Sequence, residues 1–199
     1  MRTPKFLAAA LLSLLTACSG SNTQQGECRI HGTLPSDKWD GQYIFIVPSN
    51  KEQNIGVDST KIEGNSFDLV TDKSYVGILR LHYRYRLHTQ ELLVVTEPGD
   101  VYAHIDTVSS CGGTPQNDSL QAWKQRTTEY RRKSRALTVA YKNFFSEGDS
   151  VSGNALREQS KESYKAYKEA TLRMAKEMEG TTLADFLNHL YSPKTKPTE

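Results

Sequence analysis

The chain has 199 residues, of which 37% are hydrophobic and 24% charged, and its formal net charge is +2. This length suits one domain of ordinary size with an accessory element. The nearly balanced charge gives no indication of nucleic-acid binding, and we expect no nucleic-acid partner.

The first residues have the anatomy of an export signal. Arg2 and Lys5 precede an apolar run over 6–15, which is too short for a membrane-spanning helix of roughly twenty residues. The motif Leu15-Thr16-Ala17-Cys18 resembles a bacterial lipobox. We therefore expect 1–17 to be a lipoprotein signal peptide and Cys18 to be acylated, because two or more acyl chains hold a protein stably on a membrane. An ordinary cleaved secretory signal is the alternative.

Charge is distributed unevenly in the mature chain. Removing the signal removes Arg2 and Lys5 and leaves no net charge. Residues 18–114 contain 8 Lys and Arg against 12 Asp and Glu, whereas residues 115–199 contain 15 against 11. This asymmetry could help the halves dock or attract a charged partner, and a solvated surface is the plainer interpretation, since salt screens exposed charges.

Two cysteines remain besides Cys18. Cys28 and Cys111 would lie in an exported compartment where disulfides persist. A disulfide between them would close a loop of more than eighty residues, and such a loop contributes about 4 kcal/mol in the chain-entropy model. Two separate thiols fit the sequence equally well.

A β-rich segment follows a short tether. Residues 18–26 are polar, so we expect a flexible tether that keeps the folded part near the membrane. Short runs rich in Val, Ile, Tyr and Phe, separated by Gly, Asn and Pro turns, then predict a β-sandwich of about seven antiparallel strands in a domain over 27–113. The expected strands are 28–34, 43–47, 56–62, 66–70, 76–87, 91–96 and 101–106.

The strand predicted from residue 76 alternates apolar and basic residues. Side chains alternate between the two faces of a strand, so one face is expected to be core and the other basic. The basic face could bind phosphate or carboxylate groups, because Arg presents a planar fork of donors. Its members are Arg80, His82, Arg84, Arg86 and His88. A solvated sheet face is the alternative.

Helical periodicity begins after Gly113 and predicts an extension over 114–192. A long helix over 117–146 and a second over 155–179 form a hairpin with an apolar seam. Thr182 and Asp185 are expected to cap a short third helix, which Pro193 ends, and 193–199 is expected to be a frayed tail. The seams are rich in aromatic side chains, which suit either a binding interface or packing on the sandwich. These residues are Trp123, Tyr130, Tyr141, Tyr164 and Tyr167.

Several motifs together resemble one family. They are Cys28-x-Ile30-x-Gly32-x-Leu34, Asp40-Gly41-x-Tyr43-Ile44, Asp58-Ser59-Thr60-x-Ile62-x-x-x-x-Phe67, Glu97-Pro98-Gly99-Asp100-Val101 and Gly113-Thr114-x-x-Asn117-Asp118. They are similar to an uncharacterised N-terminal domain that precedes the thioredoxin-like domain in bacterial thiol-disulfide lipoproteins. The resemblance covers roughly 27–125 and implies a β-sandwich followed by helices. The sequence given contains no Cys-x-x-Cys and ends at Glu199, about where the redox domain would begin, so the redox activity of the longer relatives is not carried over.

No motif for catalysis or metal binding is found. His82 and His88 share a predicted strand face but lie about 20 Å apart, too far for one ion. The small-residue segment 109–113 contains a thiol but reads as a loop, and no G-x-S-x-G elbow occurs. We therefore expect no cofactor, no metal and no enzymatic activity.

The sequence thus favours a non-enzymatic lipoprotein of the bacterial cell envelope, anchored in the outer membrane and facing the periplasm. It would act as a binding or assembly module with a protein partner or a second copy. One alternative is an accessory to thiol-disulfide proteins that works through Cys28 and Cys111. Another is capture of an anionic small molecule on the basic strand face.

Overall fold

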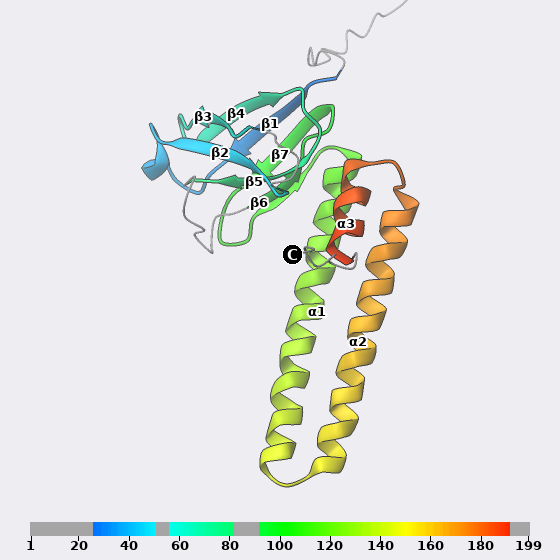
Figure 1. Ribbon diagram of the computed structural model, residues 1–199. Helices are drawn as coiled ribbons and strands as arrows, with labels where there is room; N and C mark the ends of the chain where they lie inside the picture. The colour runs from blue at the N-terminus through cyan, green and yellow to red at the C-terminus, as the bar shows by residue number, and fades with distance from the viewer. Residues whose placement is uncertain (1–25, 51–55, 82–91, 192–199) are drawn as a thin grey trace, which may run out of the picture.

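The computed structural model describes residues 26–50, 56–81 and 92–191, which form a β-sandwich with a long helical hairpin projecting from it (Figure 1). This architecture confirms the predicted fold class. The strands are β1 (Cys28–Thr33), β2 (Tyr43–Pro48), β3 (Asp58–Lys61), β4 (Ser66–Thr71), β5 (Val76–Arg80), β6 (Leu92–Val95), β7 (Gly99–His104) and β8 (Ser110–Gly112). The helices are the short 3-10 turn Asp37–Trp39, then α1 (Pro115–Ser146), α2 (Ser150–Glu177) and α3 (Thr182–Tyr191).

The strands form two four-stranded sheets. One sheet has the order β4-β1-β7-β8 and the other the order β3-β2-β5-β6. The expectation of antiparallel strands is wrong for one pair, because β7 runs parallel to β1, with Gly99 opposite Cys28. After β6 the chain crosses to the other sheet through Pro98. The strand β7 then begins beside the start of β1, so β7 and β1 run in the same direction. The strand β8 was expected to be a loop.

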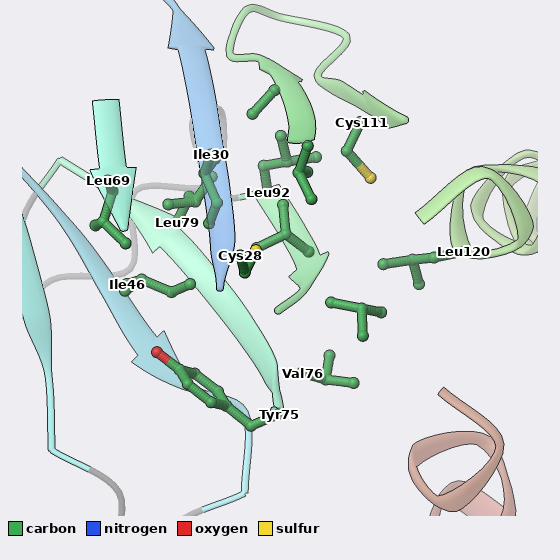
Figure 2. Packing of buried hydrophobic residues seen from close by; sticks show 14 of the residues in the cluster. Cys28, Ile30, Ile46, Leu69, Tyr75, Val76, Leu79, Leu92, Cys111 and Leu120 are labelled. Carbon is green, nitrogen blue, oxygen red and sulfur yellow. The ribbon is translucent and has the colours of Figure 1, made fainter. Parts of the chain in front are cut away.

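Period-two alternation places the core between the sheets. Ile30, Leu79 and Leu92 are at most 1% exposed, and Figure 2 shows them converging from the facing sheets. Gly32 lies under the ring of Phe67, where an added Cβ would come within 1.9 Å of the ring. A larger residue at this position would therefore displace Phe67 from the core.

The helices differ from the prediction mainly at their starts. The second helix begins at Ser150 because the Asp149 side chain accepts a hydrogen bond from the Ser152 N–H at 3.0 Å. Gly153, which precedes the predicted start of the second helix at residue 155, lies inside α2 against the ring of Phe145. The cap of α3 is Thr181, whose hydroxyl accepts from the Ala184 N–H at 3.2 Å. The hydroxyl of Thr182, the predicted cap, instead bonds Ser74 of the sandwich at 2.6 Å.

The hairpin is supported by the sandwich only at its base. A helix of this length extends about 48 Å, and α1 carries four buried residues that all belong to its first half: Asn117, Leu120, Trp123 and Thr127. Leu120 points toward the sandwich core (Figure 2). Beyond Thr127 the two helices pack on each other and project away from the sheets (Figure 1).

A polar network joins the base of α1 to the sandwich, and we call Glu97, Gln116 and Asn117 the helix junction. Glu97 Oε1 accepts from the backbone N–H groups of Gln116 at 2.7 Å and Asn117 at 3.2 Å. The Asn117 side chain accepts from Val95 N–H at 2.9 Å and donates to Val95 O at 2.8 Å. It therefore satisfies the edge of β6 as a neighbouring strand would.

Asn117→Ala is expected to lower the free energy of unfolding by about 3 kcal/mol. The substitution leaves two buried backbone groups of Val95 without their partners, and each such group costs about 1–3 kcal/mol. Urea denaturation followed by circular dichroism measures the loss.

Asn143→Ala, at an exposed position near the far end of α1, is the matched control and should stay within about 0.5 kcal/mol of the parent. Equal stabilities for the two variants would contradict the assigned role of Asn117.

Candidate interaction surface

The aromatic residues predicted to form an interface largely pack within the chain. Trp123 is 8% exposed and meets Phe186 of α3 edge-on, with ring centroids 6.1 Å apart. Tyr130 of α1 and Tyr167 of α2 stack in parallel at 4.3 Å. The interface interpretation therefore does not fit Trp123, which belongs to the core.

The remaining predicted aromatic residues are more accessible. Tyr141 is partly buried and contacts Phe145 of its own helix at a centroid distance of 6.2 Å. Tyr164 is 47% exposed and lies tilted against Tyr130 at 6.3 Å. The tyrosines thus stabilise the seam of the hairpin, and among them Tyr164 presents the largest exposed fraction.

Of the five residues predicted to form a basic strand face, the described part of the chain includes only Arg80, and this residue is not on an exposed face. Arg80 is 8% exposed, so the expectation that it lies on a solvated face is wrong. The strand β5 lies between β2 and β6, and Arg80 lies opposite Phe45 of β2. His82, Arg84, Arg86 and His88 lie outside the described residues.

The possible disulfide between Cys28 and Cys111 is not formed, and both cysteines are free and buried. Cys111 pairs with Ala103, whose partner on β1 is Gly32, four residues from Cys28. Four residues along a strand span about 13 Å, whereas the Cα atoms of a disulfide lie within about 7 Å of each other. The strand register therefore separates the two thiols.

Burial also suppresses the reactivity of the thiols. It raises the pKa of Cys28 to about 12. Burial raises the pKa of Cys111 as well, and the Lys124 ammonium, whose Nζ lies 3.7 Å from the sulfur, opposes that rise. The thiolate is the nucleophile in disulfide exchange, so neither site is prepared for redox chemistry.

A groove that the sequence did not reveal lies on the sheet of β1, β4, β7 and β8. His31 on β1 bridges two carboxylates, with Nδ1 2.6 Å from Asp68 and Nε2 3.2 Å from Asp100. Tyr102 stacks on His31 at 5.5 Å and is 60% exposed. Alternation could have placed each residue on the outer face of its strand. The antiparallel pairing of β1 with β4 puts Asp68 opposite His31, and the parallel pairing of β1 with β7 brings Asp100 and Tyr102 to it.

His104 extends this groove toward β8. Its Nδ1 lies 2.9 Å from the Thr33 hydroxyl, and its Nε2 lies 3.9 Å from Asp106. The groove has a volume of about 570 Å³. We call it the sheet groove. Within 26–50, 56–81 and 92–191, no group of three or more His, Cys, Asp or Glu residues could hold a metal ion.

The second surface feature is a basic stripe on α1. This helix contains seven Lys and Arg residues and two acids. Arg131, Arg135 and Lys142 are exposed, and their spacing of four and seven residues puts them on one face. They form no ion pair with the part of the chain that the structure describes. We call these three residues the basic stripe.

A groove of about 1110 Å³ runs along the same part of α1. It is lined by Arg131 and Arg135 of the stripe and by Val139, which is 54% exposed. The surface therefore combines positive charge with a modest apolar area, a composition suited to an acidic partner.

The fold and these surfaces define a β-sandwich protein with a projecting basic helical hairpin. Residues 28–120 match the model of a family described as a domain of unknown function (DUF4369). No curated protein matches the chain, and no solved structure does. Among the described residues, no helix is both long and apolar enough to span a membrane.

The family match ends where the projecting hairpin begins. Glu97 and Asn117, which the sequence motifs singled out, form the helix junction. Asp40 from another motif accepts from the backbone N–H groups of Gly64 and Asn65 at 2.9 and 2.8 Å. These motif residues therefore stabilise a turn and the attachment of α1 to the sandwich. The basic stripe lies outside the matched residues 28–120.

Cys28 and Cys111 are expected to resist alkylation by iodoacetamide at mildly alkaline pH. A raised pKa keeps each group protonated until the pH exceeds that pKa, and for Cys28 the reactive thiolate becomes prevalent only as the pH approaches about 12. Mass spectrometry of native protein should show slow labelling of both residues, and labelling in urea should be fast.

Lys124→Met should slow the labelling of Cys111 further, because the ammonium group lowers the pKa of that thiol. Lys176→Met, at an exposed position on α2, is the matched control and should change nothing. Native labelling as fast as labelling in urea would contradict the inertness of the thiols.

Proposed function

We propose that this protein is a membrane-tethered, non-enzymatic lipoprotein of the bacterial cell envelope that acts as a binding or assembly module. The lipobox-like motif ending at Cys18 supports a lipid anchor, placed in the outer membrane and facing the periplasm. The sandwich serves as the base, and the projecting hairpin serves as the binding element.

This proposal rests on the length of α1 that extends beyond its buried contacts with the sandwich. All four buried residues of α1 lie at or before Thr127, whereas the helix continues to Ser146. Ordering long polar helices costs conformational entropy and returns little buried apolar area. A contact with another molecule would explain why α1 continues beyond Thr127 although this part adds little to the core.

The other two hypotheses receive less support. Thiol exchange requires an accessible thiolate, and both Cys28 and Cys111 are buried with raised pKa values. Anion capture on the strand beginning at residue 76 requires an exposed Arg80, which is buried. Positive charge available for a partner is instead found on α1.

A shortened hairpin tests the binding role. The hairpin register is given by Tyr130, which stacks on Tyr167, and by Phe145, which packs on Gly153. Ser134 and Ser163 therefore lie at equivalent positions along the two helices. Deleting 135–146 and 150–162, so that the native loop residues 147–149 join these two serines, should preserve the sandwich, since the buried residues at the hairpin base remain. Crosslinking and affinity purification from envelopes should then lose the partner recovered with the parent.

Tyr43→Ala, on an exposed sandwich position, is the control and should retain the partner. A shortened protein that unfolds at the parent's temperature yet recovers the same partner would overturn the assignment of binding to the hairpin. A parent that recovers neither a partner nor a second copy would overturn the binding role.

The anchor has its own test. Metabolic labelling with palmitate should mark the parent protein, and Cys18→Ala should remove the label and release the protein from the membrane fraction. An unlabelled parent that fractionates like Cys18→Ala would contradict the anchor.

A further inference from the structure

The two parts of the chain carry opposite charge. Over the described residues 26–50, 56–81 and 92–114, the sandwich holds five Lys and Arg against ten Asp and Glu. The hairpin helices α1 and α2 together hold thirteen Lys and Arg against six acids. The hairpin projects away from the sandwich (Figure 1), and in the described structure no ion pair joins the basic stripe to it. The complementary charges therefore do not neutralise each other within one copy.

The sheet groove has the groups that would receive basic side chains. The Asp68 side chain is 69% exposed and that of Asp106 is 40% exposed. Tyr102 of β7 lines the groove together with Asp68 and His104 and presents an exposed ring, and Asp106 lies beside His104. Arg guanidinium groups bind carboxylates through paired hydrogen bonds and stack on aromatic faces, so the groove offers both kinds of contact.

The basic stripe matches this groove in charge and form. Arg131 and Arg135 are one helical turn apart, and Lys142 follows two turns later on the same face. Val139 beside them is 54% exposed and can pack on the apolar edge of Tyr102. An α-helix about 10 Å wide can lie across a sheet face of four strands spaced about 4.8 Å apart.

We propose that the basic stripe of one copy docks in the sheet groove of a second copy. This inference rests on the proposed function and names the partner of the hairpin as the same protein. Stripe against stripe and groove against groove are both repulsive, so the contact is head-to-tail and each copy uses two different surfaces. Anchoring on one membrane raises the effective concentration of copies and compensates for a modest intrinsic affinity.

Reversing the charge of each surface by substitution tests the proposal. The experiment uses the mature chain from residue 18 with Cys18→Ala, so that no lipid is attached. Sedimentation velocity at low salt should show concentration-dependent association, and high salt should weaken it because exposed charges are screened. The stripe variant is Arg131→Glu, Arg135→Glu, Lys142→Glu, and the groove variant is Asp68→Lys, Asp106→Lys.

Each variant alone should associate at least tenfold more weakly than the parent, and an equimolar mixture should regain association in complexes that contain both variants. Three reversals on α2, Arg157→Glu, Lys165→Glu and Lys176→Glu, make the same change in net charge at exposed positions and should leave association intact. Circular dichroism verifies folding, and Gln and Asn versions of the same sites replace any variant that unfolds.

A monomeric parent at low salt, or a mixture that does not regain association, would overturn the inference. Binding of the stripe to vesicles of anionic phospholipid without association between copies would overturn it in favour of a lipid surface. A monomeric parent whose hairpin still recovers another protein from envelopes would refute self-docking and leave the proposed binding function standing.

Discussion

The structure depends on the way Glu97 and Asn117 join a helix to a sheet. Asn117 completes the hydrogen bonding of β6 at Val95, and Glu97 accepts from the first free N–H groups of α1. A carboxylate at this helix end is favourable, because unpaired N–H groups and the helix dipole both attract negative charge. Gln116 extends the network to α3 by accepting from the Leu183 N–H at 2.9 Å. Two helices are thereby attached to one edge of the sandwich.

This attachment turns a weakly packed hairpin into an oriented one. Its far half buries little, and the stacked pair Tyr130 and Tyr167 keeps the helices together. Because the base is held by several directed hydrogen bonds, the direction in which α1 leaves the sandwich is fixed. The basic stripe is therefore presented at a defined distance from the sheet groove, and the acidic sandwich and the basic hairpin of one chain stay apart.

The sequence predicted much of this fold and less of its surfaces. Alternation and turn residues identified the strands, and helical spacing identified the hairpin with its apolar seam. Burial of Arg80 and the separation of Cys28 from Cys111 depend on strand order and register, which no local pattern encodes. The neighbours of His31 come from β4 and β7, 37 and 69 residues away. The motif at Glu97 and Asn117 was visible, but its role in joining a helix to a sheet emerged only in three dimensions.

The helix junction fixes the direction of the hairpin, and this can be measured. The direct measurement is the distance distribution between spin labels on Lys61→Cys and Ser146→Cys, two exposed positions on the sandwich and at the far end of α1. The protein carries Cys18→Ala, and the buried Cys28 and Cys111 do not compete for the label. We predict one narrow distribution for the parent and a broad one for the same protein carrying Glu97→Gln and Asn117→Ala. An equally narrow distribution in a folded double variant would contradict it.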